Sequence, residues 1–302
     1  MNLPKIYTDV DAARKHLESL NWPDGPICPH CGVIDQATLL KGKSTRPGVY
    51  KCRECEKPFS VTVGTLFERS KVPLNLWLYA VHLYTASKKG FSAHQLHRTL
   101  KVQYKTAWFM AHRIREAMRP TELTPMGGSG KTVEVDETFI GKLEGQQPGP
   151  KGGWAHKNVV LTLVERGGSA RSYHVDGTRL VDIVPVLRQN ISRESKLMTD
   201  EAQHYKAVRK EYADGSGAVN HKIEEYVRGN IHTNTVEGYY SIFKRGMKGV
   251  YQYCSEKHLH RYLSEFDFRY SNRIALGIND DMRAEQALKG IAGKRLTYRR
   301  PN

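Results

Sequence analysis

Two sets of side chains in this 302-residue sequence have types and spacings that suit metal binding. The first is a cysteine quartet, Cys28, Cys31, Cys52 and Cys55, in the pattern C-x2-C-x20-C-x2-C. Each pair can form a knuckle that directs two thiolates at one ion, and four thiolates around Zn²⁺ leave no open coordination position. The spacing therefore predicts a structural zinc site. Disulfides are the alternative, and a reducing intracellular environment disfavours them.

The second set consists of three acids, Asp136, Asp200 and Glu237, in the central part of the chain. Hard cations such as Mg²⁺ take oxygen ligands, and three carboxylates leave positions for water and a phosphate. Two such ions about 3.5–4 Å apart can activate the attacking oxygen and stabilise the leaving oxygen of a phosphodiester. Lys244 follows Glu237 by nearly two helical turns and carries a positive charge for a nearby phosphate. The set predicts metal-dependent phosphodiester cleavage.

Structural roles are the alternatives for these residues. Asp200 can cap the helix that follows it, and Glu237 can reach back to a cap at Asn234. An acid in the middle of a strand gains nothing from β propensity, which makes a structural role for Asp136 weaker. His232, just before this helix, can orient a phosphate or water, although a histidine at a helix start is more often structural. Because the three acids occur together, the metal interpretation is favoured.

The segment around Asp136 has the alternation of a half-buried strand. Val133 and Val135 alternate with Glu134 and Asp136, which predicts one buried face and one acidic face. Glu137 then points to the opposite face from Asp136 and is not counted as a ligand.

The rest of the central segment predicts a mixed α/β sheet. Strands are expected at residues 158–164, 171–175 and 196–200, and a helix interrupted or bent by Pro185 is expected at residues 180–190. With Asp136 in the first strand and Asp200 at the end of the fourth, the order β-β-β-α-β predicts a ribonuclease-H-like fold.

Glu237 lies near the start of an amphipathic helix. One face of this helix carries Val236, Tyr240, Phe243 and Met247, which are expected to be buried. The adjacent stripe carries Glu237, Ser241, Lys244 and Lys248. The acid and the lysines are therefore expected to project in the same direction.

Residues 73–118 have the pattern of a small helical block. An apolar face predicts a helix at residues 74–87, Ser92 is expected to cap a second helix, and a tight turn at residues 102–104 leads into a third. Two short helices with a tight turn are typical of a helix-turn-helix, although any small helical bundle gives the same pattern. The candidate DNA contacts are Lys105, Thr106, His112 and Arg113.

Charge is the strongest compositional signal, with 47 Lys and Arg against 31 Asp and Glu and a net charge of +16. The balance is 19 basic to 10 acidic in residues 1–125, 15 to 15 in residues 126–238, and 13 to 6 in residues 239–302. Basic arms around a neutral centre favour a nucleic-acid partner over scattered surface charge. No apolar stretch can span a bilayer and the N-terminus lacks a signal core, so a cytoplasmic, nucleoid-associated protein is expected.

Six stretches occur in a fixed order between about residues 20 and 290: CPHCG, YKCRECEKPFSVTVGTLFE, VEVDETFIGK, TDE, HTNTVEGYYSIFKRGMKGVY and HLHRYLSEFDFRYSNR. Together they resemble the zinc-ribbon DDE transposases of bacterial insertion sequences. The resemblance implies that Asp136, Asp200 and Glu237 are the metal-binding triad and that Lys244 is the lysine expected seven positions later. One departure is TDEAQHY, where many relatives have glycine after the aspartate, so the motif positions Asp200 less firmly than Asp136.

The resemblance implies a DNA transposase that binds the terminal inverted repeats of its element, hydrolyses phosphodiester bonds at the ends and joins the 3′-hydroxyl to target DNA. The implied cofactors are a structural Zn²⁺ and two catalytic Mg²⁺ ions, which Mn²⁺ can replace. The implied partners are double-stranded DNA and further copies of the chain, in a homodimer or higher oligomer. Lys244, Arg245 and Lys248 are expected to contact DNA.

Three domains are predicted: a zinc ribbon with an N-terminal extension (1–70), a helix-turn-helix-like DNA-binding domain (71–125) and a ribonuclease-H-like DDE catalytic domain with basic C-terminal helices (126–302). The predicted fold class is α/β, with a mixed sheet and flanking helices preceded by the ribbon and the helical domain.

Three other functions compete with this prediction. A zinc-dependent DNA-binding protein with an inactive catalytic domain is disfavoured because all three acids and Lys244 are present. A structure-specific nuclease of the same fold would lack only strand transfer. A tyrosine recombinase is suggested by His258, Arg261 and Tyr270, but such an enzyme needs no metal triad, and the same H-x-x-R spacing occurs at residues 112–115.

Overall fold

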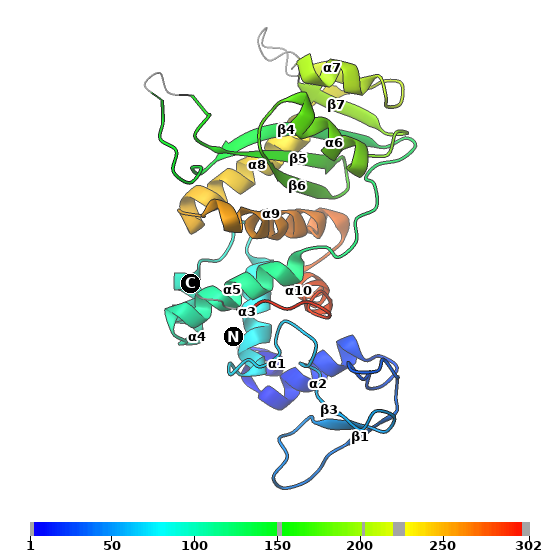
Figure 1. Cartoon of the computed structure of the whole chain (residues 1–302), viewed down its shortest axis with the longest axis vertical. Coiled ribbons are helices and arrows are strands. Elements are labelled where there is room, and N and C mark those ends of the chain that lie inside the picture. Colours follow the sequence, from blue (N-terminus) through cyan, green and yellow to red (C-terminus); the bar gives the residue numbers. More distant parts are fainter. Residues whose placement is uncertain (1–2, 150–152, 201–202, 220–226, 298–302) are drawn as a thin grey trace. The chain divides into compact units, whose positions relative to one another are not determined.

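The computed structural model describes residues 3–149, 153–200, 203–219 and 227–297 (Figure 1). It separates into two compact units. The described residues up to 87, residues 91–118 and the described residues from 279 onward form the first unit, and residues 88–90 and 119–278 form the second. Among the helices that the structure describes, none has the length and apolar character needed to cross a bilayer.

A small antiparallel sheet carries the cysteine quartet in the first unit. Its strands pair in the order β1 (Ala37–Leu39), β2 (Tyr50–Cys52), β3 (Pro58–Phe59). The edge of Trp22 packs against Tyr50 and Phe59, with ring centroids 5.5 and 5.7 Å apart. Strand β3 ends at Phe59, and the chain turns after Ser60, where Thr65 Oγ1 donates to the Thr62 carbonyl at 2.7 Å.

Helices make up the rest of the first unit: α1 (Lys5–Thr8), α2 (Val10–Asn21), α3 (Leu74–Ala86), α4 (Ala93–Leu100), α5 (Tyr104–Met118) and α10 (Asp280–Lys289). The predicted face of α3 is confirmed, since Trp77, Leu78 and Val81 are buried. Helix α10 packs on α3, and Arg283 Nη1 donates to the Thr85 carbonyl at 3.0 Å.

Helix α4 begins at the capping residue that the sequence predicted. Ser92 Oγ accepts from the Gln95 backbone N–H at 3.1 Å, and Gln95 Oε1 accepts from the Ser92 N–H at 3.2 Å. These two bonds satisfy donors at the helix start that have no partner within the helix. A left-handed residue, Lys101, ends α4 and turns the chain into α5.

A five-stranded mixed sheet organises the second unit. Its strands are β4 (Thr132–Ile140), β5 (Asn158–Glu165), β6 (Ala170–Val175), β7 (Lys196–Asp200) and β8 (Gly217–Val219), in the order β6-β5-β4-β7-β8. Strands β4, β5 and β6 pair antiparallel, while β7 pairs parallel with both β4 and β8. The predicted strand, strand, strand, helix, strand succession is confirmed. Strand β8 was not predicted, because three residues carry no measurable periodicity.

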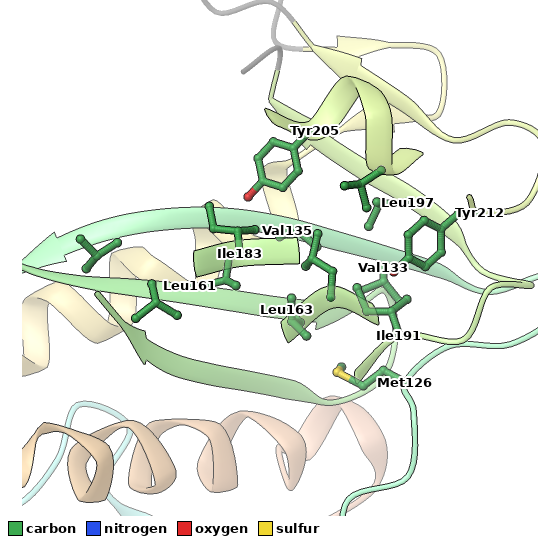
Figure 2. Close-up of a cluster of buried hydrophobic side chains, with 14 residues drawn as sticks. Met126, Val133, Val135, Leu161, Leu163, Ile183, Ile191, Leu197, Tyr205 and Tyr212 are labelled. Atoms are coloured by element: carbon green, nitrogen blue, oxygen red, sulfur yellow. The ribbon is translucent and has the colours of Figure 1, made fainter. Parts of the chain in front are cut away.

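Helices cover both faces of this sheet (Figure 1). Helix α6 (Leu180–Asn190) runs through Pro185 without interruption and, with α7 (Gln203–Arg209), covers one face. Figure 2 shows the buried cluster on this face, which includes Val133, Val135, Leu161, Leu163, Ile183 and Tyr205.

Helices α8 (Asn234–Gly246) and α9 (Glu256–Ser271) cover the other face. The predicted burial of Val236, Tyr240 and Phe243 on α8, and of Met247 just after it, is confirmed. The remaining elements are a hairpin of β9 (Val227–Arg228) and β10 (Ile231–His232), a π-helical turn (Met247–Tyr251) after α8 and a 3₁₀ turn (Ile274–Leu276).

Candidate metal centres and DNA-binding surfaces

The four cysteine sulfurs converge on one point. All four lie within 4.8 Å of one another, with 3.6 Å between the Sγ atoms of Cys28 and Cys55 and 3.7 Å between those of Cys31 and Cys52. A disulfide needs about 2.05 Å. A tetrahedron with Zn–S bonds of about 2.3 Å places its sulfurs about 3.8 Å apart. The cysteines therefore fit a closed zinc site and not two disulfides.

The backbone of the first knuckle stabilises a thiolate. Burial raises the pKa of Cys28, but the backbone N–H groups of His30 and Cys31, together with the neighbouring thiols, lower it to about 6. In the second knuckle, the Cys55 N–H points at Cys52 Sγ from 3.5 Å. The neighbouring thiols raise the pKa of Cys31 to about 12 instead, so it is the backbone donors at Cys28 that favour the deprotonated form that zinc binds.

Two of the three predicted acids lie at matching heights on neighbouring strands. In the parallel pair of β4 and β7, Glu134 is opposite Met198. This is the last paired position of the two strands; extending the register by two residues brings Asp136 level with Asp200 on the same face of the sheet, because side chains alternate along a strand. The helix-cap alternative for Asp200 depends on residues 201 and 202, which lie outside the described part of the chain.

Glu237 lies in the first turn of α8, the helix that packs on β4. Asn234 is the first residue of α8 and Thr233 is its N-cap, so the cap expected at Asn234 is wrong by one residue. Thr233 Oγ1 donates to Glu237 Oε1 at 3.1 Å. The hydrogen bond to the helix start holds a carboxylate that is otherwise exposed.

Electrostatics link the three acids. Burial raises the pKa of Asp136, the charges of Glu137, Asp200 and Glu237 raise it further, and a hydrogen bond from the Glu137 N–H opposes them, leaving it at about 7. The acids are thus near enough to repel one another. Among the described residues, only the cysteines bring three or more ligand atoms within 4.8 Å of one another, so the carboxylates are spaced more widely.

Glu134 corrects the prediction that β4 has an open acidic face. Its side chain is 0% exposed because the start of α8 lies on it. Its carboxylate accepts from the backbone N–H groups of Thr235 and Val236 at 2.7 and 3.0 Å and from Thr235 Oγ1 at 2.7 Å. A carboxylate from the strand therefore caps the helix that carries Glu237, and it complements the positive end of the helix dipole.

Arg166 completes the environment of Glu134. Its Nε donates to Glu134 Oε1 at 2.6 Å, and its Nη1 and Nη2 donate to the carbonyls of Asn230 and His232 at 2.8 and 2.9 Å. His232 Nδ1 lies 3.3 Å from Glu134 Oε1. These contacts favour the structural role for His232, which is held beside the cap rather than beside Asp136.

Two tyrosines anchor the same region. The hydroxyl of Tyr240, on α8, lies 2.5 Å from the carbonyl oxygen of Asp136 and 3.1 Å from that of Val160. On the other face, the Tyr205 hydroxyl donates to Glu137 Oε1 at 2.7 Å. Glu137 therefore points away from Asp136, as the alternation predicted. Helix α8 is therefore fixed to β4 twice, at Glu134 through its first turn and at Asp136 through Tyr240 in its second turn.

We expect Glu134→Ala to destabilise the second unit by about 3–5 kcal/mol, because it leaves Arg166 and two helix N–H groups without their buried acceptor. Lys131→Ala is the matched control: Lys131 pairs with Glu165 at 2.7 Å but is 56% exposed, so its loss should change the stability far less than the loss of Glu134. Urea unfolding of both variants measures the difference. Equal midpoints would contradict the capping role of Glu134.

Sequence analysis missed Glu134 because alternation gives the face of a strand but not what covers that face. The sequence carries no signal for it, because Thr233 and Asn234 are possible side-chain caps just before Thr235 and Val236. Only the structure shows that the N-cap residue makes no side-chain cap bond, so that the acceptor comes from β4.

Two of the three basic residues predicted in and just after α8 lie on one surface. Lys244 and Lys248 line the same pocket, and Lys244 Nζ lies 5.7 Å from the ring centre of Tyr240. Arg245 is exposed and donates to the carbonyl and hydroxyl of Ser241 at 2.9 and 2.7 Å. The predicted common direction of Lys244 and Lys248 is thus supported.

A second basic surface lies among the helices of the first unit. Lys105, Thr106 and Arg113 line a groove of about 340 Å³ together with Arg69 and Lys71, which the sequence analysis did not single out. Arg113 lies over the Phe109 ring at 4.6 Å. Burial and the charge of Arg295 lower the pKa of Arg113. An anion in this groove would relieve that repulsion.

His112 does not share this surface. It is 1% exposed and packs on Trp108, with ring centroids 4.2 Å apart. A side chain so deeply buried cannot reach DNA while α5 keeps its packing. The contacts considered for α5 are therefore Lys105, Thr106 and Arg113.

The tyrosine that suggested a tyrosine recombinase, Tyr270, is partly buried and packs against the core of the second unit. Tyr270 packs edge-on against Tyr239, with centroids 5.5 Å apart, and Arg273 lies over its ring at 4.0 Å. Burial raises the pKa of Tyr270. These contacts suit a packing residue better than a nucleophile.

Comparisons with known proteins match both the segment that carries the cysteines and the segment that carries the three acids. Residues 127–271 match the family model of the ISXO2-like transposase domain, and residues 9–58 match that of a transposase zinc-ribbon domain. An uncharacterised protein in the transposable element ISH50 of Halobacterium salinarum is 26% identical over 292 residues, which cover 88% of this chain and 92% of that protein.

Proposed function

Because this chain belongs to the zinc-ribbon DDE transposases of insertion sequences, we propose that it binds the terminal inverted repeats of its element, hydrolyses phosphodiester bonds at the ends and joins the freed 3′-hydroxyl to target DNA. The observation that carries the proposal is the electrostatic coupling of Asp136 to both Asp200 and Glu237. The charges of Asp200 and Glu237, both distant from Asp136 in sequence, raise the pKa of Asp136.

The sheet supports a ribonuclease-H-like catalytic domain. Three antiparallel strands are followed by a helix and a parallel strand, in the order β6-β5-β4-β7-β8. Asp136 lies on the central strand and Asp200 ends its parallel neighbour. This arrangement is the one in which two carboxylates on adjacent strands and a third on a covering helix can approach one phosphate.

Asp136, Asp200 and Glu237 are the residues that would hold Mg²⁺. Their donor set fits, since all the ligands are carboxylate oxygens, and a cation would remove the repulsion that raises the pKa of Asp136. Bound Mg²⁺, or Mn²⁺ in its place, supplies activation of the attacking oxygen and stabilisation of the leaving oxygen.

The chain's own residues orient this reaction. Glu134 and Tyr240 hold α8 on β4, which fixes Glu237 relative to Asp136. Lys244, two turns after Glu237, brings a positive charge to a phosphate beside the acids. Thr233 Oγ1 donates to the Glu237 carboxylate and holds it at the start of α8.

DNA binding is proposed for both basic surfaces. In the first unit, the groove with Lys105, Thr106 and Arg113 suits a phosphate backbone. In the second unit, Lys244, Arg245 and Lys248 extend the carboxylate site with positive charge. Because two element ends have to meet, a homodimer or larger assembly is proposed.

The test uses purified protein and labelled DNA that carries the inverted repeats flanking its own gene. With Mg²⁺, we expect a nick at the repeat and a product in which the labelled 3′-end is joined to a second duplex. A nick without joining would instead support a structure-specific nuclease. Repeat binding without any nick, in both Mg²⁺ and Mn²⁺, would support a DNA-binding protein with an inactive catalytic domain.

A further inference from the structure

We propose that a pocket at the C-terminal end of β4 binds an unpaired nucleotide of the DNA strand, with its base on Trp154 and its phosphates on surrounding lysines. The proposal rests on the DNA transposase function proposed above, and it names a part of the substrate that the carboxylates do not explain.

The pocket has a volume of about 330 Å³. It is formed by the end of β4 and the residues just after it, the segment before β5, and α8 with the turn that follows. Its lining includes Phe139, Trp154, Lys157, Lys244, Lys248 and Gln252. A volume at the lower end of the range for small-molecule sites suits a single aromatic group.

Trp154 provides an aromatic surface. Its side chain is 57% exposed, although tryptophan is usually among the most buried residues. It is stacked on Phe139, with centroids 5.5 Å apart and an angle of 19° between the rings. The stack holds the indole in one orientation, and a base that stacks on it loses little further freedom.

The charges around Trp154 match a nucleotide. Lys157, Lys244 and Lys248 line the pocket, and none of its described lining residues is acidic. Lys157 Nζ lies 4.2 Å from the centre of the Trp154 ring. A base that stacks on Trp154 displaces the Lys157 ammonium from the ring. The cation–π contact that is lost is weak because it is exposed, and the phosphate next to the base gives Lys157 a stronger ionic partner.

The base has to be unpaired. Inside a duplex, away from its ends, both faces of each base are stacked on neighbours, so there an exposed indole can stack only on a base that has left the helix or belongs to a single strand. Lys244 connects this pocket to the carboxylates, because it follows Glu237 by two turns on α8. The nucleotide in the pocket is therefore one close to the cleaved bond.

The experiment compares full-length wild type, Trp154→Ala and Trp154→Tyr. Fluorescence anisotropy measures the affinity of each for a short labelled oligothymidine and for a labelled blunt duplex. Trp154→Ala should weaken single-strand binding by about 5- to 150-fold, the range for one stacked base, and change duplex binding by less than about 2-fold. Trp154→Tyr keeps an aromatic face and should recover most of the loss. Thermal unfolding checks that both variants are folded.

Unchanged single-strand affinity in Trp154→Ala would overturn the pocket, as would an equal loss for both DNAs. Cleavage of element-end DNA by wild type is measured in parallel. If wild type cleaves and Trp154→Ala binds the oligothymidine normally, the pocket is wrong and the transposase function stands. If wild type does not cleave but single-strand binding depends on Trp154, the pocket stands and the function is wrong.

Discussion

Asp136→Asn should lower cleavage of element-end DNA by about 10³-fold or more and leave binding of the same DNA nearly unchanged. Asparagine keeps the size of the side chain but removes the charge that we propose holds Mg²⁺ beside the scissile bond. Metal stabilisation of the transition state is worth several kcal/mol, and each 1.36 kcal/mol is a factor of ten in rate. Gel analysis of nicked DNA and an anisotropy titration measure the two quantities.

Glu137→Gln is the matched control for this variant. Glu137 is the next residue on β4, but its carboxylate accepts from the Tyr205 hydroxyl on the other face of the sheet. The control should therefore retain cleavage. Full activity of Asp136→Asn would contradict the assignment of Asp136, and loss of DNA binding together with cleavage would indicate a folding defect instead.

Cys52→Ser should release zinc and unfold the small sheet of β1, β2 and β3. Cys52 is fully buried, and its Sγ lies 3.7 Å from that of Cys31. Three short strands have too little apolar core to fold alone, and structural zinc contributes about 10–16 kcal/mol of apparent binding free energy in comparable small domains. Elemental analysis measures zinc, and limited proteolysis reports the unfolding of residues 22–63.

Cys254→Ser is the control, since Cys254 is half-buried and lies outside the quartet. It should keep one zinc per chain and the wild-type proteolysis pattern. Retention of zinc by Cys52→Ser would show that Cys52 is not a required ligand, and protease resistance without zinc would show that the ribbon is held by its aromatic packing instead.

The sequence predicted best those features that local chemistry determines. Cysteine spacing alone identified the quartet, because the two knuckles impose it. The cap at Ser92 was predicted because its partner is only three residues away. The buried face of α8 was predicted because Val236, Tyr240 and Phe243 follow the helical period.

Features that depend on distant segments were not predicted. Glu134 has the same alternation as Asp136, and only the packing of α8 distinguishes a buried cap from a half-exposed acid. His112 and Arg113 are neighbours in sequence, yet one is buried and the other lines a groove. The packing of α10 on α3 joins segments nearly two hundred residues apart, which no local pattern encodes.

The same limit applies to Trp154. In the sequence it lies in a glycine-rich loop without periodicity, so nothing predicts that it stacks on Phe139 at the end of β4. The pocket depends on the register between β4 and β5, which brings Phe139 opposite Val159, a few residues after Trp154.

The central claim is that Asp136, Asp200 and Glu237 together hold divalent cations, and anomalous scattering from crystals grown with Mn²⁺ tests it most directly. The account predicts an anomalous peak within coordination distance of carboxylate oxygens from all three residues, in addition to the zinc peak at the cysteines. Mn²⁺ peaks confined to other sites, or bound by only one of these carboxylates, would contradict it.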